Sequence, residues 1–162
     1  MTFPQSTSSP SEQATLYEQD YAAWLFEMAA LLRASKLDEI DIANLAEELE
    51  DMGRSEKRAV ESNLEVLLQH LLKYQYQPQL RSNSWRFTIL EHRDRLAKAF
   101  RDSPSLKPYY ASIFVDAYRR ARQKAAVETG LPLETFPIES PFTPEATLNP
   151  NFLPDSDRSS DR

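Results

Sequence analysis

The chain has 162 residues, of which 41% are hydrophobic and 27% charged, and its formal net charge is −6. That length is enough for one domain with its own core. Two glycines are too few for a hairpin-rich sheet or a glycine-rich phosphate loop, and the sequence has no cysteine for disulfides, thiol catalysis or thiolate metal sites. The two histidines exclude a multi-histidine metal centre.

No stretch reaches the roughly 18 to 20 apolar residues that a membrane-spanning helix needs. The N-terminus has no basic patch followed by an apolar run, which a secretory signal would show. We therefore expect a cytoplasmic protein with no membrane partner. The acidic net charge argues against general affinity for nucleic acids, although a local basic patch can escape that average.

The two ends of the chain differ in composition from its middle. Residues 1–14 are rich in Ser, Thr, Gln and Pro and lack an apolar period, so we predict a disordered leader. Residues 15–154 are predicted to form one domain, and residues 155–162, which have no apolar anchor, a disordered tail.

Apolar residues at steps of three and four indicate helices between these ends. The first predicted helix covers residues 16–34. The second carries an apolar face and begins after Asp41, whose carboxylate suits an N-cap; the third runs from Val60 to Tyr74. Gly53 either ends the second helix, with Ser55 capping the third, or lies inside one long helix.

The last two helices are predicted over residues 85–100 and 106–125, with Gly130 just past the end of the latter. Six of the eleven prolines follow Gly130, interspersed with apolar residues, so an extended strap from about residue 131 should lie over the helices. The predicted fold is all-α: an up-and-down bundle of four or five helices with an extended Pro-rich C-terminal arm. The residues expected to be largely buried are Trp24, Leu45, Leu49, Leu67, Leu71, Trp85 and Tyr118.

Two segments, NLAEELEDMGRSE (44–56) and HLLKYQYQP (70–78), are the most specific parts of a wider likeness. Over about residues 17 to 152 the chain resembles a bacterial, largely cyanobacterial family, catalogued as domain-of-unknown-function family twenty-nine. The resemblance implies an all-helical up-and-down bundle. It implies no activity, substrate or catalytic residue.

Charge is segregated along the chain. Residues 38–65 include ten acidic and three basic side chains, whereas residues 73–101 include seven basic and two acidic side chains. The simplest interpretation is that acidic and basic helices pack together and share salt bridges, or present solvated faces. In that case Arg86 and Arg93 would pair with Glu47, Glu48 or Asp51.

Two more specific hypotheses remain open. Arg81, Arg86 and Arg93 are candidate phosphate-binding residues, with nearby aromatic side chains to stack on bases. Glu47 and Asp51 share a helix face and, with His70, are weak candidates for a divalent-cation site. The Glu-x-x-His pairs of helical di-metal sites are missing, and we expect no metal and no cofactor.

The sequence therefore favours a non-catalytic module that binds another protein or a second copy of itself. The alternative is a nucleic-acid-directed protein, such as an RNase or a toxin–antitoxin component. No catalytic residue can be named, because no Ser-His-Asp arrangement, nucleophile elbow or phosphate loop can be built from these residues.

Overall fold

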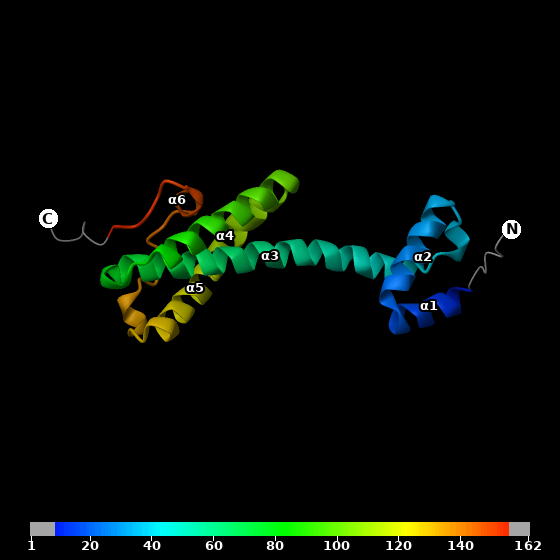
Figure 1. The fold of residues 1–162 in the computed structure, drawn as a ribbon, viewed down its shortest axis with the longest axis horizontal. Coiled ribbons are helices and arrows are strands. Elements are labelled where there is room, and N and C mark those ends of the chain that lie inside the picture. Colours follow the sequence, from blue (N-terminus) through cyan, green and yellow to red (C-terminus); the bar gives the residue numbers. More distant parts are fainter. Residues whose placement is uncertain (1–8, 156–162) are drawn as a thin grey trace. The chain divides into compact units, whose positions relative to one another are not determined.

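A computed structural model describes residues 9–155, and every regular element among them is a helix (Figure 1). The predicted fold class, all-α with a Pro-rich C-terminal arm, is confirmed. Residues 1–8 of the predicted leader and 156–162 of the predicted tail lie outside the described residues. The α-helices are α1 (Pro10–Gln19), α2 (Tyr21–Arg33), α3 (Ile42–Tyr76), α4 (Asn83–Asp102), α5 (Leu106–Thr129) and α6 (Pro144–Leu148), and three 3₁₀ turns are η1 (Leu37–Glu39), η2 (Pro78–Leu80) and η3 (Leu133–Thr135).

The chain divides into two compact units, Met1–Arg54 and Ser55–Arg162, where the sequence led us to expect one domain over residues 15–154. The core of the first unit consists of Trp24, Met28, Leu31 and Ile40, with Leu16, Tyr17 and Leu45 packed against it. Trp24 is fully buried, as predicted, and Leu45 is half-buried.

The beginning of the first unit differs from the prediction. A helix already begins at Pro10, inside the predicted leader, because Ser9 and Glu12 form a capping box that satisfies its first amides. The helix predicted over residues 16–34 is instead two helices. Asp20 leaves helical geometry at φ −146° and its carboxylate accepts the Ala23 amide at 3.0 Å, which starts α2.

Helix α3 is one continuous helix through Gly53, which settles the two alternatives left open by the sequence. Asp41 caps it as predicted, since its Oδ1 accepts the Asn44 amide at 3.3 Å. The prediction for Leu49 is wrong, because its side chain is 62% exposed.

The core of the second unit is formed by the C-terminal half of α3 together with α4 and α5, which cross it at an angle (Figure 1). Leu67, Leu71 and Tyr118 are buried as predicted, and Trp85 is half-buried. Charged pairs also join α3 to α5. Buried Lys73 donates to Glu128 at 2.6 Å.

Residues 131–155, the C-terminal arm, cover this core. Phe136 and Phe142 are buried, whereas Ile138 is 84% exposed. Side chains of α4 and α5, together with Arg81 just before α4, donate hydrogen bonds to backbone carbonyls of the arm. These bonds run from Arg122 to Leu133 and Phe136, from Tyr118 to Pro137, from Tyr110 to Pro144, from Arg93 to Thr147 and from Arg81 to Pro154.

The two glycines have opposite roles, and substituting each by alanine should have opposite effects. Gly130 ends α5 in the left-handed region at φ 70°, so Gly130→Ala should lower the free energy of unfolding by about 1 kcal/mol. Gly53 lies within α3, and an added Cβ meets no atom within 4 Å, so Gly53→Ala should raise it by about 0.5 to 1 kcal/mol. Urea denaturation of both variants measures the two effects. Equal signs would contradict the helical assignment at one of the positions.

Candidate interaction surfaces

The start of α4 forms an open, basic pocket of about 390 Å³, lined by Arg81, Ser82, Asn83 and Arg86. Ser82 is the N-cap, and its hydroxyl oxygen accepts the Trp85 amide at 3.2 Å. The remaining amides of this first turn, together with the helix dipole, favour negative charge at this end of α4.

Two of the predicted phosphate-binding arginines line this pocket. The guanidinium of Arg81 lies 4.3 Å from the centre of the Tyr74 ring and donates to the carbonyls of Tyr74 and Pro154, at 2.7 and 3.2 Å. Arg86 is exposed and donates to the Tyr74 hydroxyl at 3.1 Å. Both therefore have neutral hydrogen-bond partners.

The third of these arginines, Arg93, is 5% exposed and does not line the pocket. Its Nε donates to the Thr147 carbonyl at 2.8 Å, while its buried Nη2 has no hydrogen-bond partner. Burial lowers the pKa of Arg93. Arg93 thus holds the C-terminal arm, and its hydrogen-bond partner is not one of the carboxylates that the sequence suggested.

The acidic candidates Glu47 and Asp51 have a basic partner on their own helix. Arg54 lies 2.6 Å from Asp51, 3.3 Å from Glu50 and 3.6 Å from Glu47, and all four side chains are about half exposed or more. One base for three acids leaves this part of α3 negatively charged.

Glu48 has a different environment, since it accepts the hydroxyls of Tyr17 and Tyr21 and so fastens α1 and α2 to α3. The hydrogen bond to Glu48, followed by burial, raises the pKa of Tyr17 to about 12. Glu48 therefore stabilises the packing of α1, α2 and α3 within the first unit.

His70 and His92 are both half-buried in the second unit. His70 Nδ1 is 2.9 Å from the Val66 carbonyl. His92 Nδ1 is 2.8 Å from Asn63 Oδ1, and because the Asn63 amide nitrogen donates to Ala59, this oxygen accepts the His92 proton. Among the described residues, no group of three or more His, Cys, Asp or Glu side chains is arranged to hold a metal ion.

Acid should destabilise the second unit through these histidines. Burial is the largest cause that lowers the pKa of both imidazoles, and the cations Lys73, near His70, and Arg95, near His92, act in the same direction. The Val66 carbonyl and Glu128 at His70, and Glu91 at His92, raise the pKa values but do not cancel the lowering. The unfolded chain therefore binds protons first as the pH falls below about 6.5, and the free energy of unfolding should decrease until the folded-state pKa values are passed.

Urea denaturation at pH 7.5 and pH 5.0 measures this effect on wild type and on the His70→Gln/His92→Gln variant. The variant should lose less stability on acidification than wild type. The same loss in both proteins would show that carboxylates alone cause the pH dependence.

The first half of α3 exposes large apolar side chains. Ile42, Leu49 and Met52 are 68%, 62% and 64% exposed, and every residue from 51 to 59 is exposed. We call the face formed by Ile42, Leu49 and Met52 the α3 surface; because an α-helix completes one turn in about 3.6 residues, Glu47, Glu50 and Asp51 lie on the other side of α3. The regular apolar spacing is visible in the sequence, where it is indistinguishable from a core-facing stripe.

A second exposed apolar group lies at the basic pocket. Leu80, Phe87 and Leu90 are 54%, 63% and 50% exposed. Phe87 and Leu90 are three residues apart and so share one face of α4. With Arg81 and Arg86 they form the α4 surface. Phe87 is one of the aromatic side chains that the sequence offered for stacking, whereas the exposure of Leu80 and Leu90 was not predicted.

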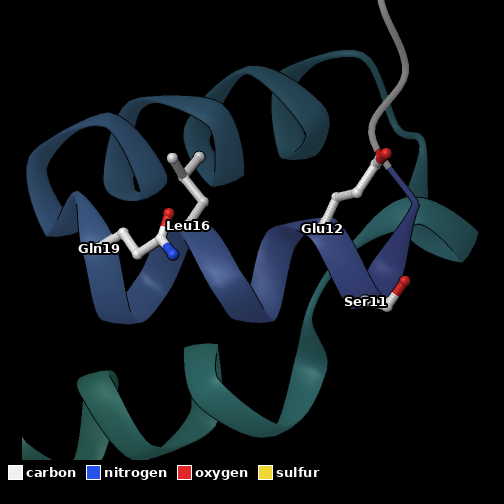
Figure 2. Close-up of a pocket in the computed structure, with 4 residues that line it drawn as sticks. All are labelled: Ser11, Glu12, Leu16 and Gln19. Atoms are coloured by element: carbon white, nitrogen blue, oxygen red, sulfur yellow. The ribbon is translucent and has the colours of Figure 1, made fainter.

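A further shallow pocket of about 320 Å³ lies on α1, lined by Ser11, Glu12, Leu16 and Gln19. In Figure 2, Glu12 reaches back toward the start of the helix, where it accepts the Ser9 amide at 2.7 Å. The polar residues of this pocket, Ser11 and Glu12, are exposed, and Glu12 already caps α1. The geometry of the pocket therefore indicates no ligand chemistry.

Residues 16–153 match the family model described as "Domain of unknown function DUF29". The chain belongs to the DUF29 family. This agrees with the resemblance seen in the sequence, and the matched DUF29 region includes both surfaces and nearly the whole arm. No curated protein and no solved structure matches the chain. None of the DUF29 helices within residues 9–155 is both long and apolar enough to cross a membrane.

Proposed function

We propose that the protein is a non-catalytic interaction module that binds a second copy of itself through the α3 surface. The observation that carries this proposal is the exposure of Ile42, Leu49 and Met52 on a helix that is exposed on all sides over residues 51–59. A solvated helical segment of that length is only marginally stable in water, and covering its apolar face would stabilise it.

A second copy is favoured as the partner because the chain itself carries a second exposed apolar surface, the α4 surface. Leu80, Phe87 and Leu90 are each at least half exposed, so every copy offers apolar area that covers exposed apolar side chains of another copy. The candidate side chains with acid–base chemistry already have structural partners: Ser82 caps a helix, and both histidines are bound through Nδ1.

The experiment is sedimentation equilibrium of the full chain over a concentration series up to about 0.5 mM, where even weak association is visible. The average mass should rise from 18.7 kDa towards a multiple of it. Leu49→Glu/Met52→Glu should remain at the monomer mass with unchanged helical circular dichroism. Val115→Glu/Val127→Glu, which also introduces two glutamates but at sites on α5 that are 70% and 85% exposed, is the control and should associate like wild type.

A monomer mass at every concentration for wild type would overturn the proposal. Association that persists in Leu49→Glu/Met52→Glu would move the interface away from the α3 surface and would overturn it as well.

The second candidate function is nucleic-acid binding, favoured by the open pocket with Arg81 and Arg86 beside exposed Phe87. Affinity for single-stranded RNA would then fall with salt, with a log–log slope of about −0.7 per phosphate contact. We rank it second because two of the three candidate arginines, Arg81 and Arg93, already bind arm carbonyls.

A further inference from the structure

We infer that the pocket at the start of α4 binds the phosphate group of a small phosphorylated molecule, through Arg81 and Arg86. This binding is separate from the proposed self-association and does not depend on it. The pocket has a volume of about 390 Å³, within the range of about 300 to 1,000 Å³ that is usual for small-molecule sites. Both arginines line it, and their hydrogen-bond partners are neutral.

One buried tyrosine holds both guanidinium groups in place. Tyr74 is 4% exposed, and the centre of its ring lies 4.3 Å from the guanidinium carbon of Arg81. The hydroxyl oxygen of the same tyrosine accepts a hydrogen bond from Arg86 at 3.1 Å. Arg81 also donates to the carbonyls of Tyr74 and Pro154. Because these contacts order the two side chains before a ligand arrives, an anion binds them at a smaller cost in conformational entropy.

The two arginines keep most of their hydrogen-bond donors for a ligand. A guanidinium has five N–H groups, and the hydrogen bonds to described residues use Nε and Nη2 of Arg81 and only Nη2 of Arg86. Neither arginine forms an ion pair with a carboxylate of residues 9–155. A phosphate group has about two negative charges and three acceptor oxygens, which suit two planar guanidinium groups. Ser82 and Asn83 add polar groups to the lining.

The other cations of α4 do not continue the pocket into a track for a polyanion. They are buried or paired with a carboxylate along most of the helix: Arg93 is 5% exposed, Arg95 pairs with Glu91 at 2.8 Å, and Lys98 pairs with Asp102 at 2.7 Å. The remaining one, Arg101, lies at the opposite end of α4. A nucleic-acid strand needs a groove of positive charge along its backbone, whereas a single pocket with two arginines suits one compact anion.

The test is titration of the full chain with inorganic phosphate and with phenyl phosphate, followed through the NMR signals of the backbone amides at concentrations where the protein is a monomer. Signals of the first turn of α4 should shift and saturate with both probes, whereas sodium chloride at the same ionic strength should not reproduce the shifts. Arg86→Gln should weaken the binding of both probes at least about tenfold, because it removes charge-assisted hydrogen bonds. Arg101→Gln removes the same charge from an exposed site at the far end of α4 and should bind like wild type. Unchanged signals away from the pocket verify that both variants fold.

Four results would overturn the inference. The first is a wild-type protein without saturable shifts, and the second is equal weakening in Arg86→Gln and Arg101→Gln, which would indicate general charge attraction. The third is binding of inorganic phosphate without phenyl phosphate, which would make free phosphate the ligand. The fourth is tighter binding of a fluorescent single-stranded RNA with a salt dependence that needs several phosphate contacts, which would make the pocket part of a nucleic-acid site. Because none of these results involves the mass of the self-associated chain, the proposed function is tested separately.

Discussion

Replacing Leu67 by alanine is expected to lower the free energy of unfolding by about 2 to 5 kcal/mol. Leu67 is fully buried on α3 in the core of the second unit, so the change leaves a cavity that the surrounding helices fill only in part. Chemical denaturation followed by circular dichroism measures the loss.

Leu49→Ala is the matched control for this experiment. It makes the same change on the same helix at a site that is 62% exposed, and it should alter stability by less than about 0.5 kcal/mol at concentrations where the protein is a monomer. A loss below that limit for Leu67→Ala, or equal losses in the two variants, would mean that the face of α3 has been assigned wrongly.

Phe136→Ala is expected to cost about 3 to 5 kcal/mol, although the residue lies in the Pro-rich arm. Phe136 is 1% exposed, and its ring packs edge-on against Tyr76 with 5.3 Å between ring centres. Removing the ring opens a cavity between the arm and α3 and weakens the attachment of the arm.

Ile138→Ala provides the comparison, because Ile138 lies two residues further along the arm and is 84% exposed. It should change the free energy of unfolding by less than about 0.5 kcal/mol. A small effect of Phe136→Ala would show that the arm does not belong to the core of the second unit.

The helices of the second unit could be predicted from the sequence because apolar periodicity reports directly which positions face a core. Leu67, Leu71 and Tyr118 are buried for that reason. Local chemistry could be predicted equally well at helix ends, where Asp41 caps α3 and Gly130 ends α5. The break at Asp20 had the same kind of signal, an aspartate before an apolar run, which the continuous period concealed.

Apolar periodicity could not predict that the side chain of Leu49 is exposed. An apolar stripe shows that a helix face is suited to burial, but it does not show what covers that face. The stripe on α3 continues from residues with a core partner, such as Leu45, to exposed Leu49 and Met52 without any change in pattern.

The candidate arginines were found by charge alone, and charge did not reveal their partners. Arg81 and Arg93 donate to backbone carbonyls of the arm. Every residue carries a carbonyl, so such a partner leaves no trace in the amino-acid sequence. Arg122 and Tyr110, which hold the arm in the same way, were missed for the same reason.

The way the arm is fastened has a consequence for how its sequence can vary. Arg81 and side chains of α4 and α5 donate to six of its carbonyl oxygens, among them those of Pro137 and Pro144. A backbone carbonyl is unchanged by most substitutions of the residue that bears it. Exposed arm positions should therefore tolerate many replacements. Inserting or deleting one residue between Pro137 and Pro144 would instead shift every later carbonyl away from its donor, so the arm should be far more sensitive to its length than to its composition.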